Sequence, residues 1–251
     1  METLYLKLKP GDISKYVLFS GDPMRVEIVK KYLENPRHIS YFREFNTYTG
    51  EYKGVPITIT STGMGAPSCA VAVEEMYQCG MEVGVRMGTV MGLSSHMLGK
   101  IFIPTACIRD EGTSKTYVRK SYPAVSDFDL ISCMEKAAEK IGRKTVKGIN
   151  CTMDGFYSQM KDSRFSKETE KNHQKTFDEL KKINCMGVDM ESSLLLTLTN
   201  LMGIKGCVVT MTTVLENLKD FLKGEERTKA EEDICLCALE GIVLYDKKEK
   251  K

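Results

Sequence analysis

The chain has 251 residues, of which 42% are hydrophobic and 28% are charged, values that fit a globular protein with a sizeable buried core. Its 36 basic and 34 acidic residues leave a formal charge of +2, which gives no reason to expect a nucleic acid or a membrane surface as partner. No apolar run approaches the roughly 20 residues that cross a bilayer, and the first residues lack a signal-peptide pattern, so we expect a cytoplasmic protein.

The first predicted elements are a buried strand over residues 15–20 and a helix over residues 26–33. Gly21 and Arg25 lie at the joint between them, and Pro23 suits the first turn of the helix. Free N–H groups and the helix dipole favour an anion at such a joint. Taken alone, however, this segment is better explained as an ordinary turn with a surface arginine.

A second glycine-rich joint follows a pair of predicted strands. Residues 41–52 are aromatic and β-prone, Lys53-Gly54 form a turn, and residues 55–60 form the next strand. Residues 61–68 then open a helix that runs to Met76. The joint does not read G-x-G-x-x-G, and no acidic residue follows at the spacing that a ribose requires, which argues against a dinucleotide cofactor.

Residues 86–92 are the most informative segment of the chain. An apolar-tending run over 81–85 leads into Arg86, and Gly88 and Thr89 follow at the expected end of the strand. A guanidinium, a hydroxyl and a glycine backbone together suit an oxyanion such as phosphate. By itself, this segment is explained about equally well by an ordinary glycine turn.

The second half of the chain continues the alternation of strands and helices. We predict a strand over 100–108, a polar loop over 109–123, a helix over 128–140 capped by Asp127, and a strand over 147–152. A solvated and partly helical loop then runs to residue 182. After it we predict a buried helix entered through 186–191, a strand over 206–213 and a closing helix over 230–245. This pattern predicts a single α/β domain over 1–251, with a central mixed, mostly parallel sheet flanked by helices. Ligands of such sheets bind at the carboxyl ends of the strands.

The cysteines and histidines do not indicate disulfides or a metal site. The nine cysteines are odd in number and irregularly spaced, no C-x-x-C pair occurs, and the three histidines are scattered. We therefore predict free thiols in a reducing compartment.

Six motifs in a fixed order resemble the hexameric purine and uridine phosphorylase family over residues 5–245. They are Gly21-Asp22-Pro23-Met24-Arg25, Arg43-Glu44-Phe45, the segment 61–68, the segment 86–92, Tyr122-Pro123-Ala124-Val125 and Val188-Asp189-Met190-Glu191-Ser192. The resemblance implies an enzyme, a nucleoside phosphorylase (a pentosyltransferase), that converts a nucleoside and inorganic phosphate to a free base and ribose 1-phosphate. No organic cofactor is implied.

The resemblance also assigns roles to single residues. It places Gly21, Arg25, Arg86, Gly88 and Thr89 at the phosphate, with Arg25, Arg86 and Thr89 catalytic, and it implies that Arg43 reaches the phosphate of a neighbouring subunit. It places Met190 and Glu191 at the ribose and Phe156 stacked on the base. Tyr5 stands where the family usually has a histidine at the 5′-hydroxyl. It implies a homo-oligomer with shared active sites, a hexamer built as a trimer of dimers. Without the resemblance, Glu191 is better explained as a carboxylate at a helix N-terminus.

These residue types fit the reaction. Cleaving an N-glycosidic bond builds positive charge on the ribose, and a phosphate dianion held beneath the anomeric carbon both stabilises that charge and attacks it. The arginines would position the phosphate and act mainly through electrostatics.

The uridine branch of the family is the closer match. The purine branch has an acidic residue at the base, after the last strand, whereas the resemblance places Val214 at that base-binding position, and valine cannot donate a proton. Gln159 and Lys161 resemble the glutamine and arginine that bind uracil if one residue is deleted between Phe156 and them. Aligned without a gap, these positions hold Met160 and Asp162.

Three other functions remain compatible with the sequence. A purine nucleoside phosphorylase, a nucleosidase that uses water and a nucleoside-binding protein without turnover are the alternatives. The uridine branch can also bind potassium between subunits near the matches of Glu44, Met64 and Ser68. A plain hydrogen bond between Glu44 and Ser68 explains that pair more simply, so no metal site is predicted.

Overall fold

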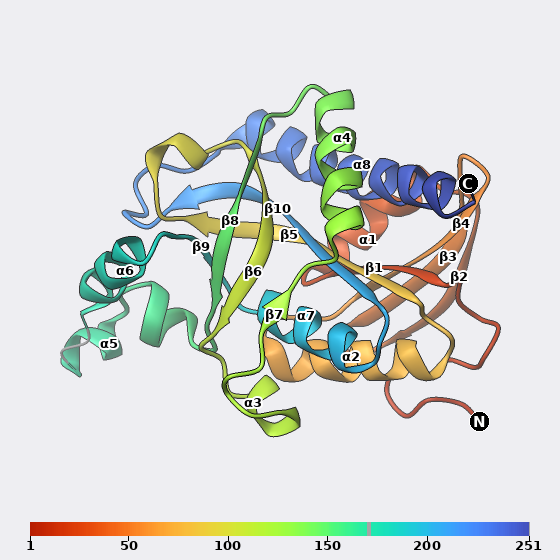
Figure 1. Cartoon of the computed structure of the whole chain (residues 1–251), viewed down its shortest axis with the longest axis horizontal. Coiled ribbons are helices and arrows are strands. Elements are labelled where there is room, and N and C mark those ends of the chain that lie inside the picture. The colour runs from red at the N-terminus through yellow and green to blue at the C-terminus, as the bar shows by residue number, and fades with distance from the viewer. Residues whose placement is uncertain (170–171, 251) are drawn as a thin grey trace.

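The computed structural model describes residues 1–169 and 172–250, which form one large mixed sheet with helices on both faces (Figure 1). The strands are β1 (Tyr16–Ser20), β2 (Glu34–Phe42), β3 (Phe45–Tyr52), β4 (Val55–Ser61), β5 (Val83–Gly92), β6 (Ile101–Arg109), β7 (Ala124–Val125), β8 (Thr145–Thr152), β9 (Cys185–Asp189) and β10 (Lys205–Leu215).

The helices connect these strands and cover the sheet. They are α1 (Pro23–Lys30), α2 (Ala66–Gln78), α3 (Ser114–Tyr117), α4 (Phe128–Lys140), α5 (Arg164–Glu168), α6 (His173–Lys182), α7 (Ser192–Leu201) and α8 (Gly224–Glu249), with the short turns η1 (Ser95–Met97) and η2 (Phe156–Met160). Among the described residues, we find no helix with the length and apolar character needed to cross a membrane.

Part of the sheet closes on itself. The strand order is β10-β6-β8-β9-β5-β1-β4-β3-β2, and β10 pairs with β5 as well as with β6, so five of these strands form a ring. The pairs of β1 with β4 and β5, of β5 with β10, and of β8 with β6 and β9 are parallel, and the five other pairs are antiparallel. The mixed α/β sheet is confirmed, although its antiparallel share is larger than predicted.

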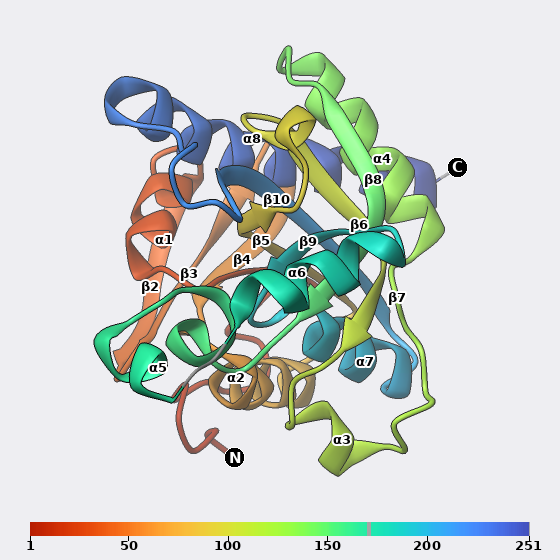
Figure 2. The same cartoon turned by 90° about the vertical axis from the view of Figure 1, so that its left-hand side faces the viewer.

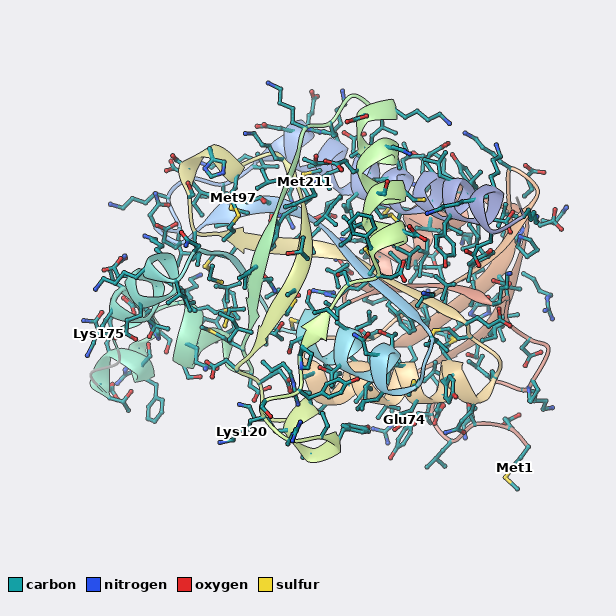
Figure 3. The ribbon with its side chains drawn as sticks, viewed as in Figure 1. Met1, Glu74, Met97, Lys120, Lys175 and Met211 are labelled. Carbon is teal, nitrogen blue, oxygen red and sulfur yellow. The ribbon has the colours of Figure 1, made fainter. Side chains whose placement is uncertain are left out.

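Two groups of helices bury the two faces of the sheet. In Figure 1, α4 and α8 lie above the sheet, while α2 and α7 lie below it. Apolar residues of α1, α4 and α8 form one core with the strands, and those of α2 and α7 form a second core. Figure 3 shows the side chains that fill these layers, and the labelled Met97 and Met211, both fully buried, lie in the interior.

Most predicted elements are present, but several differ; for example, α8 begins six residues earlier and ends four residues later than predicted, and most of β2 was not predicted as a strand. Residues 41–52 are not one strand, because Arg43 and Glu44 form the turn of a β2–β3 hairpin. Residues 86–92 belong to β5 itself and do not follow it. Residues 185–189 form the strand β9 before the buried helix α7 begins. Figure 2 shows α6 towards the viewer near β9 and α5 at the lower left, both within the segment predicted as a solvated, partly helical loop.

A buried carboxylate links three distant elements and makes the stability of the fold pH-dependent. Glu240 of α8 accepts hydrogen bonds from Tyr52 at 2.7 Å, from Lys140 at 2.6 Å and from Lys53. Burial alone would raise the pKa of Glu240, but these partners outweigh it and lower the pKa to about 2. The charged carboxylate therefore stabilises the fold above its ordinary pKa of 4.5, and this contribution disappears as pH falls towards 2.

We predict that Glu240→Gln lowers the free energy of unfolding by about 2 kcal/mol at pH 7, after allowance for solvent around the half-exposed lysines. The difference from the unmodified protein should shrink steadily between pH 4.5 and pH 2. Urea unfolding across this range measures it. A difference that stays constant with pH would show that the carboxylate charge is not responsible.

Candidate functional site

A cavity of about 470 Å³ opens where the sheet is interrupted beside β5. One edge of β5 pairs with β10 throughout, while the other edge pairs first with β1, to Arg86, and then with β9, from Met91. Between these two points the edge is open to the cavity. The lining residues are Gly21, Asp22, Pro23, Arg25, Met64, Arg86, Thr89, Val90, Met91, Phe156, Met160, Val188, Asp189, Met190, Glu191, Thr213 and Val214.

The end of the cavity beside β1 carries a buried arginine at a helix N-terminus. Asp22 caps α1 by accepting a hydrogen bond from the Met24 N–H at 2.9 Å, and Pro23 is the first helical residue. Arg25 is 6% exposed, and its Nε has no hydrogen-bond partner among the described residues. Because a buried donor without a partner is costly, this end of the cavity is suited to an anion.

A second buried arginine, Arg86, lies between two carboxylates. Its Nη2 is 2.5 Å from Glu191 Oε2 and 3.1 Å from Asp189 Oδ2, and its Nε donates to Asp189 at 3.2 Å. Burial lowers the pKa of Arg86, but the two carboxylates more than offset this effect and the pKa is raised overall. The guanidinium therefore stays charged in the cavity.

Gly88 lets the Arg86 guanidinium lie close to the backbone of β5. A Cβ atom added at Gly88 would lie 3.1 Å from Arg86 Nη1 and 3.3 Å from its Cζ. A side chain here would make a tight contact, so the guanidinium would have to shift by a few tenths of an ångström. Gly88 thus acts by shaping the site, while Thr89, the next residue of β5, lines the cavity itself.

Glu191 connects Arg86 to the start of α2. Its Oε1 accepts a hydrogen bond from the Gly65 N–H at 2.6 Å, and Gly65 adopts a φ of 95° that glycine tolerates. Glu191 precedes α7, yet its carboxylate does not cap that helix. Burial raises the pKa of Glu191, Asp189 adds to the rise, and Arg86 opposes it only in part. A buried carboxylate at this point can accept hydrogen bonds from hydroxyl groups of a ligand.

The opposite end of the cavity is mainly apolar. Phe156 of η2 is 38% exposed and lines the cavity together with Met190 and Val214. Met91, Met153, Met160 and Val188 form a small core beneath them. An exposed aromatic ring above an apolar floor is suited to a planar, weakly polar group.

Asp189 lines the cavity and was not assigned by the sequence analysis. Besides Arg86, its Oδ1 accepts hydrogen bonds from Asn150 Nδ2 at 2.8 Å and Thr152 Oγ1 at 2.9 Å, and Ser192 donates to its Oδ2. This fully satisfied carboxylate fixes Nε and Nη2 of Arg86. Its place two residues before Glu191, on the same side of the chain, is the signal that could have revealed it.

The sequence profile of the Phosphorylase superfamily matches residues 15–240, about nine-tenths of the chain. The chain belongs to this superfamily. It is 37% identical over 206 residues to the uridine phosphorylase of Thermococcus kodakarensis, covering 81% of this chain and 74% of that protein. It is 29% identical over 234 residues to the uridine phosphorylase of Escherichia coli, covering 92% of each.

A solved structure shares the fold as well. The uridine phosphorylase of Vibrio fischeri superposes with a TM-score of 0.85 at 28% identity, covering 96% of this chain and 97% of that one. The resemblance to nucleoside phosphorylases that the motifs indicated is confirmed.

Of the residues that the resemblance assigns to a site, eight line the cavity beside β5. They are Gly21, Arg25, Arg86, Thr89, Phe156, Met190, Glu191 and Val214. Two others, Arg43 and Tyr5, lie together elsewhere on the surface. Arg43 is exposed in the β2–β3 turn, and its Cζ is 5.5 Å from the centre of the Tyr5 ring.

Gln159 and Lys161, assigned to the base, are not placed in this cavity. Gln159 Oε1 accepts a hydrogen bond from the Gly155 N–H at 2.7 Å and so closes the η2 turn. Lys161 is exposed and lines a separate cavity beside α6. Deleting one residue before them preserves their spacing, but η2 winds as a wide turn in which Gln159 bonds back to Gly155 and Lys161 follows the last residue.

The pair considered for potassium forms a simple hydrogen bond. Ser68 Oγ donates to Glu44 Oε1 at 2.7 Å. Among the described residues, no group of three or more histidine, cysteine, aspartate or glutamate side chains is arranged to hold a metal ion.

Proposed function

We propose that this protein catalyses the reversible phosphorolysis of uridine to uracil and ribose 1-phosphate. The observation that carries this proposal is a single cavity that holds two buried arginines, Arg25 and Arg86, near a buried carboxylate and an exposed aromatic ring. The relatives named above, described as uridine phosphorylases, support the choice of reaction and of base.

Inorganic phosphate would bind at the end of the cavity beside β1. Arg25 offers the free Nε, Arg86 offers the Nη1 over Gly88, and Thr89 and the N-terminus of α1 add neutral donors. Held there, a phosphate oxygen attacks the anomeric carbon as the bond to the base breaks. The arginines act by orienting the phosphate and keeping its charge close to the positive ribose.

The ribose would lie between the phosphate and the base. Glu191 is positioned to accept hydrogen bonds from ribose hydroxyls, because it is already fixed by Gly65 and Arg86. Met190 lines the same part of the cavity and would contact the sugar. The Arg86–Glu191 pair links the two substrates, since one residue holds phosphate and the other holds ribose.

Uracil would stack on Phe156 above the apolar end of the cavity. Val214 lies where the purine branch requires a proton donor, which argues against that mechanism. We retain purine nucleosides as the alternative substrates.

The active form would be a homo-oligomer with shared sites. Arg43 and Tyr5 lie side by side on the surface, as expected if they are presented together to the phosphate and 5′-hydroxyl of a neighbouring subunit. We propose a hexamer built from such dimers. Mass photometry at assay concentration tests this, and full turnover by a monomer of 28.2 kDa would contradict it.

No organic cofactor is proposed, and inorganic phosphate is the co-substrate. We propose the reducing cytoplasm as the location, which is supported by nine cysteines that are all free and buried.

The decisive experiment incubates the protein with a panel of nucleosides, with and without inorganic phosphate, and follows each base by chromatography. We expect uracil release from uridine only when phosphate is present, with one ribose 1-phosphate formed per uracil. Equal release without phosphate would identify a nucleosidase. Faster release from guanosine or inosine would identify the purine alternative, and binding without any release would identify a nucleoside-binding protein.

A further inference from the structure

The apolar end of the cavity lacks the polar partners that were expected for a base. Gln159 is used within η2, and Lys161 lines the other cavity. The wall formed by Met91, Met160, Val188 and Val214 offers no hydrogen-bonding side chain. A base with several polar edge atoms would be poorly matched by such a wall alone, because each unpaired edge atom loses its bond to water.

One hydroxyl side chain lies in this wall because β10 contains a bulge. Thr212 pairs with Val90 and Val214 pairs with Met91, so Thr213 is an extra residue without a partner on β5. In a regular strand, Thr213 and Val214 would face opposite sides, yet both line the cavity. Bulges near active sites often redirect a side chain in this way.

The bulge lies beyond the phosphate end along β5. Its pairing partners, residues 90 and 91, directly follow Thr89, the last residue of β5 assigned to the phosphate. Thr213 is 2% exposed, and we find no hydrogen bond of its hydroxyl to any other described residue. This hydroxyl is therefore free to bond with a ligand in the cavity.

We propose that Thr213 is the side chain that hydrogen-bonds with the edge of the base, an inference that rests on the proposed function. A threonine hydroxyl both donates and accepts, so it can pair with a uracil carbonyl or with the N3–H group. Its methyl group continues the apolar wall. Thr213 of β10 would thus bind the edge of the base, the role that the resemblance assigned to Gln159 and Lys161.

The test compares three variants. Thr213→Val keeps the shape of the side chain and removes the hydroxyl, Thr213→Ser keeps the hydroxyl, and Thr212→Val is the matched control. Thr212 is the preceding residue, its hydroxyl is buried without a partner, and it does not line the cavity. For each variant we would measure kcat and KM for uridine, KM for phosphate, and the Kd of free uracil by calorimetry.

For Thr213→Val we expect the KM for uridine and the Kd for uracil to rise about tenfold, the effect of one neutral hydrogen bond, with KM for phosphate unchanged. Thr213→Ser and Thr212→Val should stay within about twofold of the unmodified protein. A Thr213→Val variant with unchanged uridine and uracil binding, or with an equal loss for phosphate, would overturn the inference. If the unmodified protein releases no base yet uracil binding still depends on Thr213, the proposed reaction fails and the role of Thr213 stands.

Discussion

Replacing Arg86 by alanine is expected to lower kcat/KM for uridine phosphorolysis by about 10²–10³-fold. Arg86 is 4% exposed, and a buried charge beside the reacting phosphate acts more strongly than a charge in solvent. It also fixes Glu191 at 2.5 Å, so its loss disturbs the ribose contact as well. Steady-state kinetics with both substrates varied measure the effect.

Two further variants separate catalysis from folding in this experiment. Arg86→Lys keeps a positive charge between Asp189 and Glu191 but lacks the planar fork, so most of the activity should still be lost. Arg164→Ala removes an arginine whose side chain is 96% exposed and should leave turnover unchanged. Activity within tenfold of normal in both Arg86 variants would show that this arginine does not hold the phosphate.

Replacing Asp189 by alanine is expected to lower the free energy of unfolding by about 3 kcal/mol or more. Asp189 is 5% exposed, and its removal leaves the donors of Asn150 and Thr152 and part of the Arg86 charge without partners in the interior. KM for phosphate should also rise, because Arg86 loses the group that sets its orientation. Urea unfolding and phosphate titrations measure the two effects.

A surface ion pair supplies the control for Asp189. Glu135 and Lys147 are 2.6 Å apart, with side chains that are 30% and 42% exposed. Glu135→Ala should cost no more than about 1 kcal/mol, because solvent screens an exposed pair. If Asp189→Ala costs no more than this control, the buried network does not hold Arg86 in place.

The sequence predicted the alternation of elements well because apolar periodicity and turn residues are local signals. The helix over residues 128–140, with its Asp127 cap, is confirmed to the residue, and Pro23 lies in the first turn of α1 as predicted. It missed β9, since a five-residue strand that enters directly into an apolar helix gives no separate pattern. It also missed the β2–β3 turn, where Arg43 takes a left-handed φ of 55° without a glycine to signal it.

The sequence by itself indicated candidate residues for a phosphate, and the resemblance of its motifs to a family added candidates for a sugar and a base, because motifs and glycine spacing can be recognised in one dimension. Only the tertiary structure decided which of them share a cavity. The gap between β1 and β9 along β5 brings Arg86 to Asp189, more than a hundred residues away, and such long-range pairing has no local signature. The bulge at Thr213 and the hydrogen bond of Gln159 to the Gly155 N–H likewise depend on how neighbouring strands and turns pack, which the local sequence does not fix.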